Sequence, residues 1–114
     1  MKRDEFVRNL AAGTYDLIVM DVLHRGPNYG YGIGKLIFER SKGTIRWHEG
    51  TLYPVLHRLE KRGLLASETK FPKRGHERRY YRLTTRGQRV WREQRDQWTG
   101  FQRDINLLLG SVTR

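Results

Sequence analysis

The chain has 114 residues, a length that fits a single domain. Lys and Arg number 23 against 12 Asp and Glu, so the net charge is +11 with His neutral. No apolar run approaches ~18 residues, which excludes a transmembrane helix, and no apolar signal-peptide core follows Met1, so we expect a cytoplasmic protein. Cysteine is absent, which excludes disulfides, thiolate metal sites and a Cys nucleophile. A small polar domain buries a modest core, so dimerisation would add to its stability.

The positive charge is concentrated in the middle of the sequence. Residues 42–83 carry eleven Lys and Arg and four Asp and Glu, which is +7 of the total +11. A local excess of this size is typical of a protein that binds a polyanion. The alternative is that these side chains only keep the protein in solution, but solubilising charge is usually mixed in sign.

Apolar residues at a spacing of three to four predict two helices near the N-terminus. The first is a short helix within Lys2–Leu10, part of an N-terminal arm over residues 1–13. The second covers residues 14–24, because Thr14 is a good N-cap and Asp16 lies in the first turn, where the helix dipole favours an acid.

The next segments are a helix over residues 31–40 and a short β-like piece over Thr44–Trp47. The Gly34-Lys35 pair within the helix resembles the end of a phosphate-binding loop. That interpretation fails, because Tyr29 stands where the motif requires its first glycine, five positions before Gly34.

The most informative segment is a helix predicted to have its N-cap between Glu49 and Thr51 and to end before Gly63. An apolar stripe with helical period is expected to face the core; it comprises Leu52, Val55, Leu56 and Leu59. The opposite face has Arg58 and Thr51 at its flanks and carries Gly50, Pro54, His57 and Lys61. Proline disfavours a helix interior, so we expect Pro54 close to the first turn.

A basic hairpin follows. Alternating residues predict a strand over Leu65–Phe71, a turn over residues 72–76 and a return strand over Arg78–Leu83. Of the adjacent Tyr80 and Tyr81, one is expected in the core and one on the surface. The tip of the hairpin carries one acid, Glu77, among the cationic or basic side chains Lys70, Lys73, Arg74, His76, Arg78 and Arg79.

A long helix, capped by Thr84 or Thr85, is expected to reach Leu109. At ~25 residues it spans roughly 37 Å, which is longer than a domain of this size needs for its own core. Its residues at alternating spacings of three and four form a stripe: Trp91, Gln94, Trp98, Phe101, Ile105 and Leu108. Such a seam usually packs against an identical one in a twofold dimer. Alternatively it covers the chain's own first helices, and the two ends of the stripe can differ in this respect.

These elements predict a mainly α fold with a small β-wing: a winged helix-turn-helix extended by a long C-terminal helix. We divide it into a DNA-binding domain, residues 1–83, and a dimerisation helix, residues 84–114. Small residues at the start of the third helix allow close approach to a phosphate or a base edge, and the free amides there attract anions. Two joined copies would meet two half-sites ~34 Å apart.

Three motifs in this order resemble the PadR family of winged-helix transcriptional regulators. They are Gly26-Pro27 followed by Gly30-Tyr31-Gly32-Ile33, the stretch Glu49–Leu64, and Arg79-Tyr80-Tyr81-Arg82-Leu83-Thr84 with Gly87. The single C-terminal helix is similar to that of the family's small subclass. Tyr29 and Gly32 depart from the commonest pattern, which has a frequent His and a frequent acid at these places.

The resemblance implies a homodimeric repressor that binds an inverted-repeat operator and is often released by a small molecule. By this resemblance Tyr31 would contact a DNA phosphate, and we group Lys35 on the same helix with it. The residues implied for the major groove are Thr51, Tyr53, Pro54, His57 and Arg58. Those implied for the backbone or the minor groove are Lys73, Arg74, His76 and Arg78. Members of the small subclass can stack flat aromatic ligands between tryptophans at the dimer interface, a role that would fall here to Trp91 and Trp98.

Each of these residues also has a structural interpretation. Tyr31 and Tyr53 could be half-buried packing rings, and Thr51 could be only a helix cap. His57 is expected to be exposed, where it either reads a base or contacts solvent. Glu49 and Glu60 are expected to tune helix ends. Trp91 and Trp98 could simply form the dimer core.

Three other classes of function were compared with a site-specific regulator. An enzyme is disfavoured, because the four His and twelve acids show no metal-ligand spacing and no nucleophile–base pattern, and no cofactor is expected. An RNA reader should show aromatics on an exposed sheet, whereas the sequence predicts a single hairpin. Non-specific, nucleoid-type DNA binding fits the charge and is the main alternative, since phosphate contacts dominate both kinds of binding.

Overall fold

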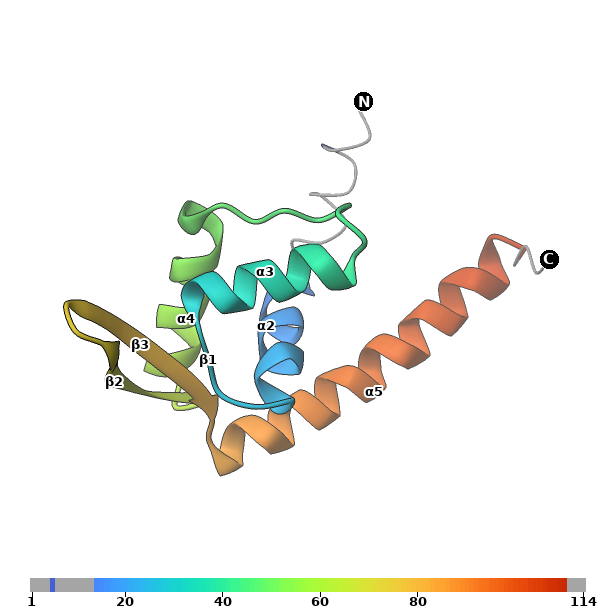
Figure 1. The fold of residues 1–114 in the computed structure, drawn as a ribbon. Helices are drawn as coiled ribbons and strands as arrows, with labels where there is room; N and C mark the ends of the chain where they lie inside the picture. Colours follow the sequence, from blue (N-terminus) through green and yellow to red (C-terminus); the bar gives the residue numbers. More distant parts are fainter. Residues whose placement is uncertain (1–4, 6–13, 111–114) are drawn as a thin grey trace.

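The computed structural model describes Glu5 and residues 14–110 (Figure 1). The elements are α2 (Tyr15–His24), β1 (Asn28–Tyr29), α3 (Gly30–Arg40), α4 (Glu49–Lys61), β2 (Leu65–Lys73), β3 (His76–Leu83) and α5 (Thr85–Leu108). The helix predicted within Lys2–Leu10 lies outside the described residues, Glu5 excepted. Among the helices described, none is long and apolar enough to cross a membrane. The architecture is the mainly α fold with a small β-wing that the sequence predicts.

The core lies between α2, α3, α4 and the base of the sheet. The apolar stripe predicted for α4 is buried on all four of its residues, Leu52, Val55, Leu56 and Leu59. They pack with Val19 and Met20 of α2 and Ile33 of α3, none of which has measurable exposure. A few such side chains bury enough apolar surface to hold three short helices together, and the outer face of α4 stays free.

The hairpin of β2 and β3, residues 65–83, is called the wing from here on. The two strands are antiparallel, with Leu65 opposite Leu83, and a third strand, β1, pairs with β3. Tyr81 is 1% exposed and Tyr80 lies half-buried on the other face, which confirms the predicted split between core and surface.

The β-like piece predicted over Thr44–Trp47 is wrong, because this segment is a loop. The Ser41 side chain takes up a backbone group of this segment instead, because its hydroxyl accepts a hydrogen bond from the Ile45 N–H over 2.9 Å. Side-chain bonds of this kind compete with strand pairing. The third strand is Asn28–Tyr29, a segment for which the sequence predicts no strand.

Helix α4 begins one residue earlier than expected, with His48 as its N-cap. Thr51 is therefore a half-buried residue of the first turn rather than the cap, and Pro54 lies in the second turn rather than close to the first. Proline has no N–H, so Pro54 cannot donate to the carbonyl of Gly50. Both residues are on the exposed face, where water can reach that carbonyl.

Helix α5 is capped by Thr84, whose hydroxyl accepts from the Gly87 N–H over 3.0 Å. Its first turns pack on α2 and β3, and the rest projects away from the other helices (Figure 1). With 24 residues it is roughly 36 Å long. Most of its length is therefore available for contacts outside the chain's own core.

Candidate nucleic-acid interface

The exposed face of α4 presents small and polar residues at its start and basic residues toward its end. The exposed members are Gly50, Tyr53, Pro54, His57, Arg58 and Lys61. The absence of bulk at Gly50 and Pro54 lets another surface approach the helix closely. The exposure of His57 confirms the prediction from its phase on the helix.

Tyr53 fixes the spacing between α3 and α4. Its ring is 37% exposed and its hydroxyl lies over the first residue of α3, Gly30. A Cβ at Gly30 would be 2.5 Å from that hydroxyl, so a larger residue there would require the Tyr53 ring to move. Tyr53 thus combines packing on α3 with partial exposure beside His57, whose ring centroid is 6.3 Å away.

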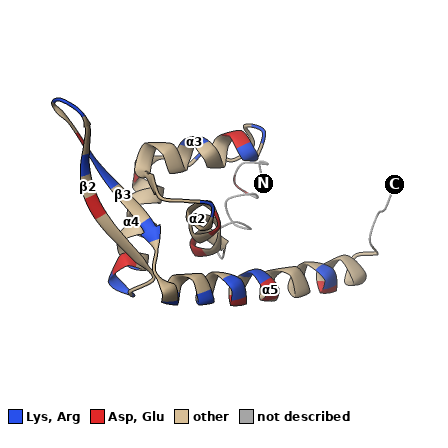
Figure 2. Cartoon of the chain, turned by 60° about the horizontal axis from the view of Figure 1, so that its bottom comes forward, with Lys and Arg blue, Asp and Glu red and all other residues tan. Residues whose placement is uncertain are grey.

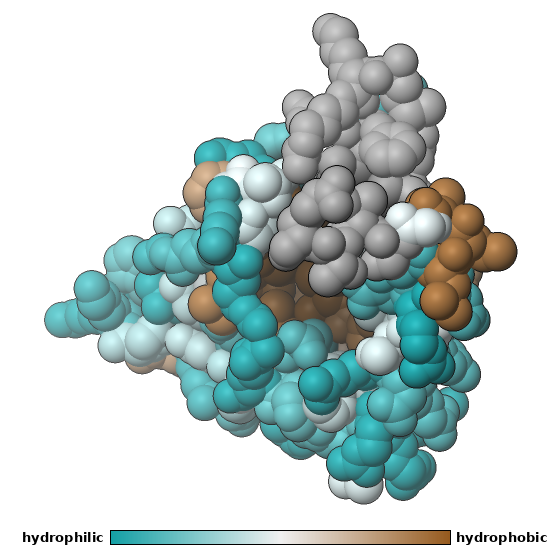
Figure 3. Space-filling model, turned by 90° about the vertical axis from the view of Figure 1, so that its right-hand side faces the viewer, coloured by the Kyte–Doolittle hydropathy of each residue, from teal (hydrophilic) through white to brown (hydrophobic). Residues whose placement is uncertain are grey.

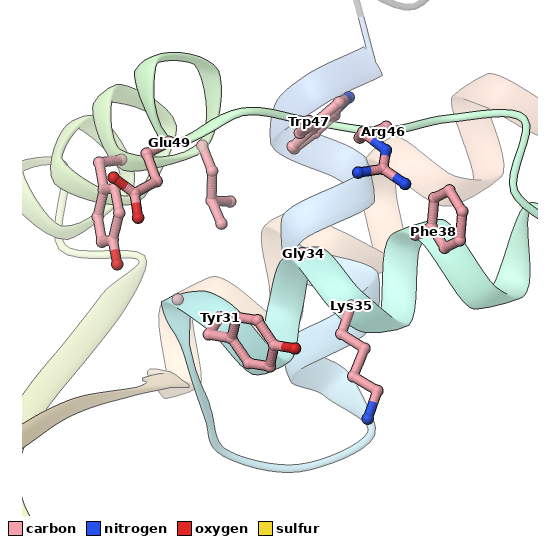
Figure 4. A pocket seen from close by; sticks show the side chains of 10 residues that line it. Tyr31, Gly34, Lys35, Phe38, Arg46, Trp47 and Glu49 are labelled. Atoms are coloured by element: carbon pink, nitrogen blue, oxygen red, sulfur yellow. The ribbon is translucent and has the colours of Figure 1, made fainter.

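A hollow of about 310 Å³ separates the start of α3 from the start of α4 (Figure 4). Tyr31 and Lys35 line it from α3, and Arg46 lines it from the loop before α4. Tyr31 is 70% exposed, so it is not a packing ring. Arg46 is not among the residues predicted from the sequence; its guanidinium lies 4.7 Å from the centre of the Phe38 ring. A single cation in a connecting loop forms no periodic pattern from which a binding role could be predicted.

The wing carries its cations along both strands and at the tip (Figure 2). Lys73, Arg74 and His76 are exposed, whereas Arg78 is half-buried. Its guanidinium lies 4.5 Å from the centre of the Tyr29 ring, a cation–π contact that orients it.

Tyr29 belongs to a row of rings and cations on the outer face of the sheet. Its ring centroid is 5.3 Å from that of Tyr80 and 6.3 Å from that of Tyr31. The amine of Lys70 lies 5.1 Å from the Tyr80 ring centre. The row joins the wing to the start of α3, so the tyrosine that departs from the commonest family pattern has a structural role in this chain.

Arg58 does not point freely outward. It is ion-paired and hydrogen-bonded with Asp16 of α2, and Arg62 approaches the other oxygen of this carboxylate to 3.3 Å. Asp16 thus offsets part of the positive charge at one edge of α4. It is also the acid predicted in the first turn of α2.

Glu60 links α4 to the wing instead of only tuning the helix end. Its carboxylate accepts a short hydrogen bond from the Ser67 hydroxyl and lies 3.7 Å from Arg79. Next to this cluster, burial raises the pKa of the Tyr81 phenol above its ordinary value, although the nearby Arg79 opposes the shift. The base of the wing is therefore fastened to α4 by polar and apolar contacts together.

The stripe on α5 divides into two parts. Trp91 is 5% exposed and stacks on His24 of α2 with ring centroids 3.6 Å apart. The structure places Trp91 in the chain's own core, so the expectation that it shares one open seam with Trp98 is wrong. At 5% exposure the Trp91 ring leaves little surface in the single chain for a partner or a flat ligand.

The second part of the stripe is open. Trp98, Phe101 and Leu108 are 40%, 56% and 80% exposed, while Gln94 and Ile105 are half-buried. Figure 3, which faces the end toward which α5 projects, shows hydrophobic residues in a central hollow and in a separate projecting cluster. An apolar groove of about 410 Å³ lies between α2, α3 and α5, with Leu17, Ile37 and Trp98 in its lining and Arg40 and Arg95 at its polar side.

No group of three or more His, Asp or Glu side chains that could hold a metal ion occurs in the described part of the chain. The site therefore consists of a helix with a small, basic outer face, a basic wing beside it and a positively charged hollow at its start. Three helices and a wing in this arrangement define the winged-helix class of DNA-binding proteins.

Comparisons with known proteins agree with this class. The Transcriptional regulator PadR-like family matches residues 19–93. Transcriptional regulator Rv3488 of Mycobacterium tuberculosis is 40% identical over 76 residues, which cover 67% of this chain and 70% of that protein.

Solved structures extend the similarity to nearly the whole chain. A PadR family transcriptional regulator from Eggerthella lenta has 37% identity and a TM-score of 0.82, and the match covers 95% of this chain and 92% of that one. A transcriptional regulator from Clostridium thermocellum has 31% identity and a TM-score of 0.79, over 86% and 92% of the two chains. The chain belongs to the PadR-like family of transcriptional regulators. It is a DNA-binding regulator and not an enzyme.

Proposed function

We propose that this protein is a homodimeric repressor that acts in the cytoplasm on an inverted-repeat operator. In this proposal residues 1–83 form the DNA-binding part and residues 84–114 the dimerisation part. The observation that supports it is that one chain has both a basic surface, formed by α4 and the wing, and an open apolar stripe on the projecting helix α5.

The DNA contacts follow from what is exposed. Helix α4 would enter the major groove with its outer face, where Tyr53, Pro54 and His57 can approach base edges and Thr51 and Arg58 lie at the flanks. Tyr31 and Lys35, at the hollow before α4, would contact phosphates on one side. Lys73, Arg74, His76 and Arg78 of the wing would contact the backbone or the minor groove on the other side.

The dimer would form through the open part of the stripe: Gln94, Trp98, Phe101, Ile105 and Leu108. Exposed leucines continue this surface to the end of the described helix, since Leu107 and Leu109 are 73% and 78% exposed. Contiguous apolar surface of this kind on a protein otherwise so polar is the mark of a protein–protein contact. A twofold axis across it would give the dimer two copies of the surface formed by α4 and the wing.

A small aromatic effector would bind next to the dimer contact. Trp98 lines the groove between α2, α3 and α5, whereas Trp91 is covered, so Trp98 is the tryptophan available for stacking. Titration of the purified dimer with flat dyes, followed by tryptophan fluorescence, tests this part. Quenching in the wild type and its loss in Trp98→Phe is the expected result, and no quenching by several chemotypes contradicts it.

The main test is competition. The protein is mixed with an inverted-repeat duplex taken from the DNA next to its own gene, and random duplex DNA is added as competitor. A specific regulator should prefer the repeat by ~10³ or more. Equal competition by random DNA would instead support the second candidate, non-specific nucleoid-type binding, which the charge of the wing and α4 also allows.

A further inference from the structure

The wing contains a bulge close to its tip. Lys70 pairs with Arg78 and Lys73 with His76, so two residues on β2, Phe71 and Pro72, lie opposite one residue on β3. A bulge of this kind bends the strand and re-aims the side chains within it. Pro72 suits the place, because a residue that cannot donate to the ladder is tolerated where pairing is interrupted.

The bulge displays a large apolar side chain with nothing to cover it in the described structure. Phe71 is 69% exposed, and it is the one large hydrophobic residue of the wing that is exposed in this way. Exposed apolar rings on a hairpin tip cost solubility and invite aggregation. The cost indicates a partner that covers the ring when the protein works.

The chemistry around Phe71 selects the partner. Lys70 precedes it, Lys73 and Arg74 follow it, and Arg78 is on the opposite strand. The tip is a tight two-residue turn of Arg74 and Gly75, and the φ of Gly75, 80°, is in the left-handed region; Lys70 and Lys73 lie on β2 and Arg78 lies on β3. An apolar ring framed by cations complements a surface with phosphates outside and stacked bases inside, which is the minor groove of duplex DNA.

We propose that Phe71, aimed by the bulge, is an apolar wedge that enters the minor groove and partly unstacks one base step in each half-site. The proposal deepens the proposed function, since it assigns the wing a part in choosing the DNA. Proteins that place an apolar side chain between base steps kink the duplex and gain selectivity from its deformability. Pyrimidine–purine steps open most easily, so a TA or CA step is expected beneath the wing.

The experiment uses the full chain and a duplex that the wild type selects from a random-sequence pool. 2-Aminopurine replaces adenine at successive positions, because its fluorescence rises when the base unstacks, and end-to-end energy transfer reports bending. We expect the wild type to raise the fluorescence at one step in each half-site and to bend the duplex. Phe71→Ala should abolish both signals and lower the affinity on the order of tenfold, while Phe71→Leu should keep part of them.

Arg74→Ala is the matched control on the same tip. It should reduce the affinity and lower the salt slope by about one, without removing the fluorescence rise, because it deletes a phosphate contact only. Thermal unfolding of both variants verifies that the wing is intact, as expected for exposed positions.

Three results would contradict either the Phe71 wedge or the proposed function. A fluorescence rise that persists in Phe71→Ala, or wild-type binding without any rise, overturns the wedge and leaves the regulator intact. A change in dimer mass in Phe71→Ala overturns it in favour of a contact between copies of the chain. Failure of the wild type to select any duplex from the pool overturns the proposed function itself.

Discussion

The indole N–H of Trp91 on α5 donates a hydrogen bond to Oδ1 of Asp21 on α2, over an N···O distance of 3.1 Å. The other oxygen of this carboxylate lies 3.6 Å from Arg25, the C-cap of α2, and 3.6 Å from Arg40 of α3. Asp21 therefore connects α5 to both α2 and α3. The direction in which α5 leaves the core depends on this junction.

Trp91→Ala should lower the free energy of unfolding by about 3–5 kcal/mol, because it removes a buried aromatic ring and leaves Asp21 without this donor. Urea unfolding followed by circular dichroism measures the loss. Trp98→Ala is the matched control, since its ring is 40% exposed in the single chain. The effect of Trp98→Ala should shrink on dilution, as dimers dissociate, whereas that of Trp91→Ala should not. The same dependence on concentration for both variants would place Trp91 at the dimer contact after all.

Phe101→Glu should convert the proposed dimer to monomers, because in the proposed contact between copies the charge would be buried without a partner. Light scattering after gel filtration gives the mass. Gln102→Glu, one residue along the same helix and off the stripe, introduces the same charge and should leave the dimer unchanged. A dimer that survives Phe101→Glu would contradict the proposed contact.

Asp16→Asn should strengthen DNA binding about twofold to tenfold at low salt, because Arg58 and Arg62 lose the carboxylate that offsets their charge. Fluorescence anisotropy at two salt concentrations measures the change, which should decrease as salt screens the charges. In an Arg58→Ala background the gain should mostly disappear. Weaker binding by Asp16→Asn would show instead that Asp16 holds Arg58 in its binding position.

Arg58→Ala should by itself weaken DNA binding without unfolding the chain, since its side chain is half exposed at the edge of α4. Anisotropy and a thermal melt measure the two effects. Lys42→Ala, which removes a cation from the loop behind α3, is the control and should change affinity less. Equal losses from both variants would mean that overall charge, rather than the α4 face, governs binding.

Tyr81→Phe should make the free energy of unfolding less dependent on pH in the alkaline range. Burial raises the pKa of the Tyr81 phenol above 10.0, its ordinary value. The unfolded chain therefore releases this proton first, so the stabilisation is complete below pH ~10 and is lost as the pH rises through the raised pKa. Urea unfolding between about pH 8 and pH 11 should show a shallower decline in Tyr81→Phe than in the wild type. The exposed Tyr31→Phe is the control, and an identical decline in wild type and Tyr81→Phe would contradict the prediction.

The fold could be predicted from the sequence wherever one periodicity decides the structure. The stripe of Leu52, Val55, Leu56 and Leu59 has the helical period and is buried as expected. The alternation in the hairpin likewise predicts that one of Tyr80 and Tyr81 lies in the core, and the structure buries Tyr81. Local propensity failed at Thr44–Trp47, where the Ser41 hydroxyl accepts from the Ile45 N–H and the segment is a loop.

The residues of the candidate site could be predicted from the sequence, but the contacts between their side chains could not. Exposure of His57 follows from its phase on α4, whereas the ion pair of Arg58 joins residues 42 positions apart, which no local pattern encodes. The same holds for Arg78 over the Tyr29 ring and for the burial of Trp91 against His24. A stripe on a long helix gives the contact face but not the point along the helix at which the chain's own core ends.

Because Trp91 anchors the first turns of α5 to the core, the direction of the open stripe depends on the number of residues between Trp91 and the stripe. Each residue inserted there would turn the stripe by about 100°, while each base pair inserted between half-sites turns the DNA by about 35°. These two angles have no small common multiple. Inserting single residues into α5 would therefore not restore the fit of the proposed dimer to an operator with a longer spacer. Spacer length in its target DNA should therefore be nearly invariant among sites bound by the same dimer.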